Sequence, residues 1–238
     1  MGVKRETLAR LLGRYGSAAN GEQVDAWMRL LAALAAEPDP PTTVRAPEEA
    51  LDVHVADSLS GLEIPELRRA PTIADIGSGA GFPGLALALA LPTARVDLIE
   101  AAARKCAVIE RLSAAAGAGR ARAIPARVEE WAGAEGREVY DAVTARAVGP
   151  LAVLCEYAAP LLRPGGVLVA WKGRRDAEEE EAGARAAAEL GMRPDRVVAV
   201  EPFPGAHSRH LHVVTKVAPT PERFPRRPGV ASKRPLGG

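Results

Sequence analysis

A glycine-rich stretch over residues 75–84, Asp-Ile-Gly-Ser-Gly-Ala-Gly-Phe-Pro-Gly, constrains the fold of this chain more than any other segment. It follows a short apolar run at 72–74 and precedes a longer one at 85–91, which indicates a strand, a tight turn and a helix. The four glycines let the backbone turn sharply and let a ligand approach without a Cβ in the way. In open α/β sheets, such a turn after the first strand binds nucleotide-like ligands.

The spacing of the glycines fits two classes of cofactor. Gly79, Gly81 and Gly84 satisfy the G-x-G-x-x-G fingerprint of dinucleotide-binding proteins. Asp75 followed by Gly77 fits equally well the acidic residue and glycine loop with which methyltransferases bind S-adenosylmethionine. A glycine turn that binds nothing is the third alternative. The residues that follow the neighbouring strands are needed to distinguish between the two cofactors.

From residue 71 onward, short apolar runs alternate with helical patterns, which predicts an α/β domain with a mostly parallel, Rossmann-like sheet. We expect seven strands, at 72–76, 95–100, 121–125, 139–145, 166–171, 196–200 and 211–217. Helices are expected between them at 83–91, 103–116, 127–132, 150–162 and 176–190. No helical pattern separates the last two strands, so we expect the last strand to run antiparallel to the others.

The chain divides into three predicted parts. Residues 1–65 form a helical N-terminal region with helices at 4–15, 21–36 and 47–60, and residues 66–218 form the cofactor-binding domain. Residues 219–238 form a basic, proline-rich tail. This tail is either disordered or an arm that contacts nucleic-acid phosphates, and its candidate phosphate contacts are Arg226, Arg227, Lys233 and Arg234.

Composition limits the classes of function. The net charge of +1 means that any nucleic-acid site is local rather than spread over the whole surface. Cys106 and Cys155 are far apart and lack C-x-x-C spacing, so we expect no disulfide framework and a reducing compartment. The N-terminus lacks a signal-peptide pattern, and the longest apolar run is too short to cross a bilayer. We therefore expect a cytoplasmic protein without a membrane partner.

Two acidic residues follow the second and third predicted strands. Glu100 ends the second strand, where a carboxylate beside the glycine turn can accept both ribose hydroxyls of an adenosine. This role serves either cofactor, and the alternative is an acid that faces solvent. Val128 and Glu129 follow the third strand, beside the position that adenine takes in a methyltransferase-type sheet. Glu129 is alternatively an ordinary acid in the first turn of a helix.

Two basic residues follow the fourth and fifth strands. Arg146 can hold the carboxylate of a cofactor or stack on a base, or it can form a surface salt bridge. Asp141 lies at the other end of the same predicted strand. Lys172 has the equivalent place after the fifth strand and can meet an RNA phosphate. Both cations are therefore candidate binding residues.

The histidines do not predict a catalytic triad or a metal site. His54, Asp57 and Ser58 share one helix face, but one helix does not position a nucleophile, a base and an orienting acid. A structural contact between His54 and Asp57 and a role in substrate binding are the two remaining interpretations. His210 and His212 would face one side of a strand, but no Cys or carboxylate nearby completes a ligand set, so we predict no metal.

Together these motifs resemble the bacterial 16S ribosomal RNA guanine-N7 methyltransferase family, also called glucose-inhibited division protein B. The resemblance covers about residues 40–236. Its segments are Thr43-Val-Arg45, His54-Val-Ala-Asp57-Ser58-Leu59, Asp75 to Gly84, Arg127-Val-Glu129, Tyr140-Asp141, Ala145-Arg146-Ala147, Pro160-Leu-Leu, Gly165-Gly166, Lys172-Gly173, Arg209-His210-Leu211, Phe224 to Gly229 and Lys233 to Leu236. The family usually has Asn-Leu-Thr where this chain has Pro41-Thr42-Thr43, so a role of that asparagine is not carried over.

The resemblance implies a seven-stranded S-adenosylmethionine-dependent methyltransferase fold behind a helical N-terminal region. It implies methyl transfer to N7 of a guanine in 16S rRNA near the decoding site, with 16S rRNA or the small ribosomal subunit as the partner of a monomer. The cofactor residues that it implies are Gly77, Phe82, Val128, Glu129 and Arg146. Glu100 is added from its place at the end of a strand.

Guanine N7 has a free lone pair and no proton to lose, so this reaction needs no general base. Alignment of the reactants is then the main task of the enzyme, and Arg146 is the candidate for positioning. Three other functions stay open on the residues alone: methylation of a small molecule or a protein, NAD-dependent oxidoreduction, and nucleotide binding by a regulator without catalysis.

Overall fold

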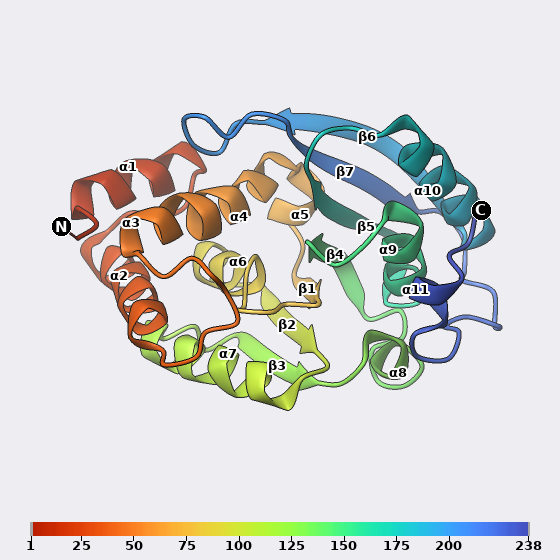
Figure 1. The fold of residues 1–238 in the computed structure, drawn as a ribbon, viewed down its shortest axis with the longest axis horizontal. Helices are drawn as coiled ribbons and strands as arrows, with labels where there is room; N and C mark the ends of the chain where they lie inside the picture. The colour runs from red at the N-terminus through yellow and green to blue at the C-terminus, as the bar shows by residue number, and fades with distance from the viewer. Residues whose placement is uncertain (1, 238) are drawn as a thin grey trace.

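The computed structural model describes residues 2–237 and has a seven-stranded sheet at its centre (Figure 1). The strand order is β3-β2-β1-β4-β5-β7-β6, and β7 runs antiparallel to both of its neighbours. The other pairs are parallel, so the predicted sheet and its reversed last strand are confirmed. The strands are β1 Thr72–Ile76, β2 Arg95–Glu100, β3 Ala121–Pro125, β4 Tyr140–Arg146, β5 Leu162–Lys172, β6 Met192–Val200 and β7 Arg209–Lys216.

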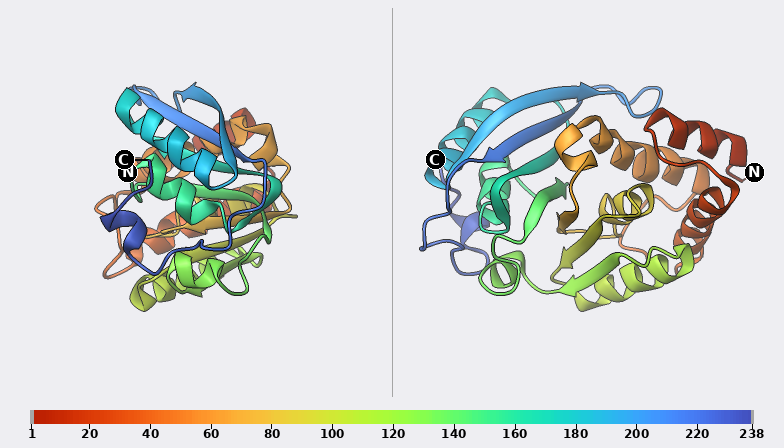
Figure 2. Two further views of the ribbon diagram at one scale, coloured as in Figure 1. Left: turned by 90° about the vertical axis from the view of Figure 1, so that its right-hand side faces the viewer. Right: turned by 180° about the vertical axis from the view of Figure 1, so that it is seen from behind.

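Helices cover both faces of this sheet (Figure 2). They are α6 Gly84–Ala90, α7 Ala103–Ala116, α8 Val128–Ala132, α9 Leu151–Ala158 and α10 Ala177–Glu189. Successive strand residues face opposite sides. Ile73 belongs to a core with α6 and α7, whereas its neighbour Ala74 belongs to a core with α9 and α10. The near-continuous apolar runs of the sequence are explained by this burial on both faces.

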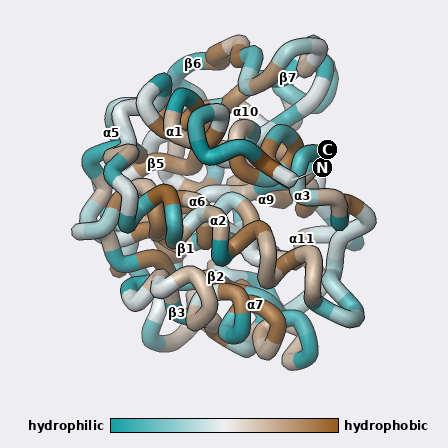
Figure 3. The backbone as a smooth tube through the Cα atoms, turned by 90° about the vertical axis from the view of Figure 1, so that its left-hand side faces the viewer, coloured by the Kyte–Doolittle hydropathy of each residue, from teal (hydrophilic) through white to brown (hydrophobic). Residues whose placement is uncertain are grey.

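The N-terminal region packs against the α6–α7 side of the sheet. It contains α1 Arg5–Arg14, α2 Gly21–Ala36, α3 Pro47–Ala50, a π-helical segment Leu51–Ala56, α4 Asp57–Leu59, a 3₁₀ segment Ser60–Glu63 and α5 Pro65–Arg68. Hydrophobic stretches lie within α2 and α7, coloured brown in Figure 3, and these two helices contact each other. The N-terminal helices therefore share one core with the sheet, and the domain boundary at residue 65 stays a prediction.

The helix predicted over 47–60 is a series of short segments with a π-helical turn in the middle. Sequence periodicity does not predict a π turn here, because the π-helical segment is only six residues long. Such turns are frequent at functional sites. Here the turn carries His54 and lies directly before Asp57.

Two strands begin earlier than predicted, because an irregular pairing extends each of them. Strand β5 starts at Leu162, and its register against β4 shifts between Tyr140 and Ala142, so α9 ends at Ala158 rather than 162. Strand β6 starts at Met192, and its register against β7 shifts after Pro194. The sequence pattern did not predict these strand starts because they contain Gly165, Gly166 and Pro194, and both residue types usually end a strand pattern.

The C-terminal tail has a defined path, so the disordered alternative is wrong for residues 219–237. Phe224 and Ala231 are buried, and a short helix, α11 (Val230–Lys233), contacts α9. The tail runs beside α8 and α9 in Figure 1. Among residues 2–237, every helix falls short of the length and apolar character that a bilayer crossing requires.

Candidate active site

The glycine turn places backbone where side chains would not fit. Gly77 has φ +64°, and a Cβ on it would lie 2.8 Å from Cγ2 of Val148. Its N–H donates to the carbonyl of Ile99 at 2.9 Å, which ties the end of β1 to β2. A larger residue at position 77 would be strained and would also collide with the loop after β4.

Asp75 holds the turn from inside the protein. It is fully buried, and its carboxylate accepts the N–H of Gly84 at 3.1 Å and the hydroxyl of Thr144 at 2.9 Å. Burial raises the pKa of Asp75 to about 6, although these hydrogen bonds favour the charged form. A Cβ on Gly84 would lie 2.6 Å from Cδ2 of Leu98, so the start of α6 packs closely on β2. Asp75 therefore shapes the turn and does not face a ligand.

Glu100 lies at the rim of a pocket beside this turn. Its Oε2 accepts the N–H of Gly79 at 3.1 Å, and its Oε1 accepts the N–H of Ala102 at 2.9 Å. The pocket has a volume of about 160 Å³. Four of the six predicted cofactor residues line it, namely Gly77, Glu100, Val128 and Glu129, together with Val148 and Tyr157. We call this space the first pocket.

Glu129 lines the first pocket and is also an acid in the first turn of α8, so its two alternative positions in the sequence analysis are compatible. It is 6% exposed. Its Oε1 accepts the N–H of Gly229 at 2.8 Å, across 100 residues of sequence. The tail therefore contacts the wall of the first pocket, which the sequence did not predict.

Phe82 lies under the ring of His54 rather than in the first pocket. The ring centroids are 4.7 Å apart with an interplanar angle of 10°. His54 Nε2 lies 3.0 Å from Oγ1 of Thr42. Burial, assisted by the nearby Arg146 guanidinium, lowers the pKa of His54 to about 4, so this ring is neutral at pH 7. His54 thus connects the N-terminal region to the glycine turn.

Arg146 forms a mostly buried ion pair with Asp57. Its Nη1 donates to Oδ2 of Asp57 at 2.7 Å and to the carbonyl of Val53 at 3.1 Å. This corrects two sequence alternatives, since Arg146 makes no surface salt bridge and the partner of Asp57 is Arg146 rather than His54. The hydroxyl of Ser58 donates to the carbonyl of His54 within the helix, which agrees with the rejection of a triad.

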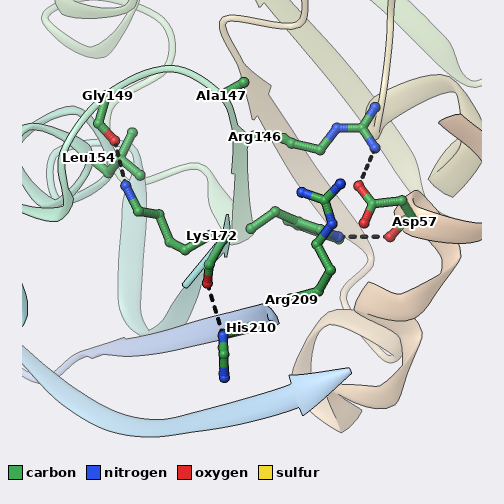
Figure 4. A pocket seen from close by; sticks show the side chains of 10 residues that line it. Asp57, Arg146, Ala147, Gly149, Leu154, Lys172, Arg209 and His210 are labelled. Atoms are coloured by element: carbon green, nitrogen blue, oxygen red, sulfur yellow. Dashed lines mark hydrogen bonds and ion pairs between the residues drawn. The ribbon is translucent and has the colours of Figure 1, made fainter. Parts of the chain in front are cut away.

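A second pocket of about 220 Å³ lies on the other side of the β4 terminus (Figure 4). Arg146 and Arg209 point toward Asp57 in this view. Lys172 Nζ pairs with Oε1 of Glu179 at 2.6 Å and donates to the carbonyl of Gly149 at 3.2 Å. Other lining residues are Ala147, Leu154, Trp171, Gly173 and His210.

Arg209 is a site residue that sequence reasoning did not single out. It begins β7, and β7 is antiparallel to β5. The amino end of an antiparallel strand lies beside the carboxyl ends of its parallel neighbours, which is where ligands bind. The predicted direction of the last strand was therefore the signal that could have identified Arg209.

The two pockets adjoin at the loop after β4. Val148 lines the first pocket, whereas Ala147 and Gly149 line the second. Ala147 has φ +58°, a conformation that is uncommon for a residue with a Cβ and is frequent at functional sites. The strand order reverses between β1 and β4, and open α/β sheets bind ligands at this switch point. The arrangement can hold two reactants side by side.

The remaining candidates lie outside both pockets. Asp141 is at the opposite end of β4, where it accepts the N–H of Thr72 at 3.0 Å. Arg226 pairs with Glu156, which is 2% exposed. Arg227, Lys233 and Arg234 are exposed on the tail. Residues 2–237 contain no cluster of three His, Cys, Asp or Glu side chains arranged to hold a metal ion.

Solved structures with this architecture include methyltransferases and a ribosomal RNA processing protein. The 16S rRNA (adenine(1408)-N(1))-methyltransferase from Catenulisporales acidiphilia is 18% identical, with a TM-score of 0.52 over 63% of this chain and 87% of that one. The fibrillarin pre-rRNA processing protein from Methanococcus jannaschii is 18% identical, with a TM-score of 0.54 over 68% of this chain and 74% of that one. At this identity, the likeness shows the fold alone.

Sequence relatives identify the family. The model of the family described as rRNA small subunit methyltransferase G matches residues 22–211. The ribosomal RNA small subunit methyltransferase G of Rubrobacter xylanophilus is 41% identical over 98% of this chain and 92% of that protein. The protein of the same name from Chloroflexus aggregans is 42% identical over 82% of each chain. This chain therefore belongs to the rRNA small subunit methyltransferase G family.

Proposed function

We propose that this protein transfers a methyl group from S-adenosylmethionine to N7 of a guanine in 16S rRNA, near the decoding site. One observation supports this most directly: two pockets adjoin at the switch point of the sheet, one beside the glycine turn and one lined by cations. The family membership supports a ribosomal RNA of the small subunit as the substrate. The first pocket would then hold the cofactor, and the second would receive the guanine.

The residues of the first pocket fit S-adenosylmethionine. Two backbone N–H groups hold the Glu100 carboxylate in place, and a carboxylate there can accept both ribose hydroxyls. Glu129 can accept a hydrogen bond from the exocyclic amino group of adenine with Oε2, while its Oε1 accepts the N–H of Gly229. Gly77 leaves space for the methionine end, and Phe82, supported by His54, packs behind the turn.

The second pocket supplies orientation rather than proton transfer. S-adenosylmethionine supplies an electrophilic methyl group when it is bound. Guanine N7 attacks with a lone pair and releases no proton, so no residue has to act as a base. Asp57 and Lys172 are each held in an ion pair, with Arg146 and Glu179 respectively. Arg146 is fixed at the border of the pockets by Asp57 and positions the base.

Cations around the second pocket support recognition of RNA. We propose Lys172 and Arg209 as phosphate contacts near the reacting base, and the exposed Arg227, Lys233 and Arg234 as contacts farther away. Base methylation requires a base that is unstacked, which suits a loop of rRNA. We further propose a monomer that acts in the cytoplasm, in which residues 1–65 are a helical N-terminal region, residues 66–218 the cofactor-binding domain and residues 219–238 a basic tail. Met1 and Gly238 lie outside the described residues.

The direct test is methylation of small ribosomal subunits by the purified protein, with labelled S-adenosylmethionine and mass mapping of the modified nucleotide. We expect one 7-methylguanine near the decoding site. Methylation of another base, or of a small molecule and not rRNA, would replace this substrate. Cofactor binding without turnover on naked rRNA, subunits or assembly intermediates would favour a regulator instead.

A further inference from the structure

We infer that the C-terminal segment 219–237, here called the strap, positions Glu129 and so contributes to binding of the cofactor. This inference rests on the proposed function in one respect, that the first pocket binds S-adenosylmethionine. The sequence suggested a different role for the strap, as an arm for RNA. Two of its contacts are made to α8 and α9, the two helices that border the first pocket.

The first contact is made to Glu129. The N–H of Gly229 donates to its Oε1 at 2.8 Å. A buried carboxylate without a hydrogen-bond donor is costly, and N–H bonds to a charged acceptor are stronger than neutral ones. Within residues 2–237, Gly229 supplies the one hydrogen bond found to this carboxylate. The strap therefore determines where Oε2 points, and Oε2 is the atom that we assign to adenine.

The second contact is made to Tyr157. Its hydroxyl lies 2.9 Å from Oγ of Ser232 in α11, and Tyr157 also lines the first pocket. Glu129 belongs to α8 and Tyr157 to α9. One segment therefore holds both walls of the pocket, and its displacement would loosen them together.

Separate anchors hold the strap in position. Arg226 Nε donates to Oε1 of Glu156 at 2.6 Å, and its Nη2 donates to the carbonyl of Arg234 at 2.9 Å. The carbonyl of Phe224 accepts from Nη1 of Arg137 at 3.0 Å. Glu156 directly precedes Tyr157 on α9. The ion pair thus fixes the strap one residue from Tyr157 in the pocket wall.

Substitutions at Gly229 test whether the position of its backbone N–H matters. Gly229 has φ +78°, and among residues 2–237, apart from Gly229 itself and its two chain neighbours, no atom lies within 4 Å of the position that a Cβ would occupy. Asparagine tolerates this left-handed conformation, whereas a β-branched residue does not. Gly229→Asn should therefore keep the hydrogen bond to Glu129, and Gly229→Val should displace the N–H that makes it.

The first experiment uses full-length variants of the anchor. Arg226→Gln is compared with Arg223→Gln, which removes an equal charge from the strap but breaks an exposed pair with Glu189. Calorimetry with S-adenosylhomocysteine measures the dissociation constant of the cofactor site. We expect Arg226→Gln to weaken binding roughly tenfold, the size expected for a hydrogen bond to a charged group, and Arg223→Gln to leave it unchanged. Arg226→Gln with Glu156→Gln removes the unpaired buried charge and should recover most of the loss.

The second experiment compares the two Gly229 variants and decides the matter even where Arg226→Gln does not fold. Gly229→Val should weaken cofactor binding about fivefold, in line with the strain of a left-handed residue, while Gly229→Asn stays near wild type. In turnover assays, the KM for S-adenosylmethionine should rise and the KM for the ribosomal subunit should not.

Unchanged cofactor affinity in both Arg226→Gln and Gly229→Val would overturn the inference. So would a loss confined to the affinity for the ribosomal subunit, which would assign the strap to RNA. Failure of the wild-type protein to bind S-adenosylhomocysteine would count against the proposed function itself. This result can be told apart from failure of the strap inference, because it is measured on the wild-type protein before any variants are compared.

Discussion

The neutral histidine His54 of the N-terminal region makes stability depend on pH in a way that one substitution can isolate. His54 is buried against Phe82, and its pKa falls from 6.5 to about 4 on folding. The unfolded chain therefore takes up a proton before the folded protein does. The stability due to this difference is fully present above pH 6.5 and is lost as the pH falls toward 4.

The size of the effect follows from the two pKa values. Each pKa unit corresponds to about 1.4 kcal/mol, so the loss reaches roughly 2 kcal/mol at pH 5, which lies 1.5 units below the unfolded value. Between pH 7.5 and 5, wild type should thus lose about 2 kcal/mol relative to His54→Gln, which cannot take up this proton. Other groups titrate in both proteins, so they cancel in the difference.

Urea unfolding of both proteins at pH 7.5 and pH 5.0 measures this difference. His207→Gln serves as the control, because His207 is exposed and lies outside the site. The reasoning is refuted if the free-energy difference between wild type and His54→Gln is the same at both pH values. Such a result would mean that the folded protein accepts the proton on His54 as readily as the unfolded chain.

Three further predictions concern the pockets. Arg146→Ala should lower the free energy of unfolding by about 3–5 kcal/mol in urea melts, because it leaves Asp57 buried without its partner, and Arg146→Ala with Asp57→Asn should recover part of this. Both variants should lose methyl-transfer activity. Gly77→Ala should weaken S-adenosylhomocysteine binding at least tenfold in calorimetry, since a Cβ would lie 2.8 Å from Val148 in a left-handed conformation. Lys172→Met should lower affinity for the ribosomal subunit and reduce the salt slope of binding by about one, with cofactor affinity unchanged.

Each of these three predictions can be contradicted by one measurement. Equal destabilisation in the single and double Arg146 variants would show that the buried charge of Asp57 is not the cause. Wild-type cofactor affinity in Gly77→Ala would mean that the loop after β4 moves away from the new Cβ with little loss of free energy. An unchanged salt slope in Lys172→Met would remove this lysine from the phosphate contacts.

Local sequence patterns predicted the sheet and most of the first pocket. Strand and helix periods depend on neighbouring residues, so the strands appeared near their true positions. Gly77, Glu100 and Glu129 follow strands whose carboxyl ends must converge in a parallel sheet, so their meeting at one pocket follows from topology. The starts of β5 and β6 were missed where glycine and proline occur within paired strands.

The contacts that complete the site join residues far apart in the chain. Arg146 and Asp57 are separated by 89 residues, and Glu129 and Gly229 by 100. A local sequence pattern does not predict which residue is the partner of a buried charge. The sequence therefore offered His54 as the partner of Asp57 on grounds of helix spacing, and the folded chain pairs Asp57 with Arg146 instead.

By itself, the amino-acid sequence determined the order of the elements, the glycine turn at residues 75–84 and the strand ends that border the first pocket. These depend on backbone freedom and on side-chain periodicity, which act over a few residues. The tertiary structure alone decided that Phe82 stacks on His54, that Arg209 joins the second pocket, and that the strap holds Glu129. Burial strengthens the contacts of His54 and Glu129, and burial exists only after distant segments have packed together.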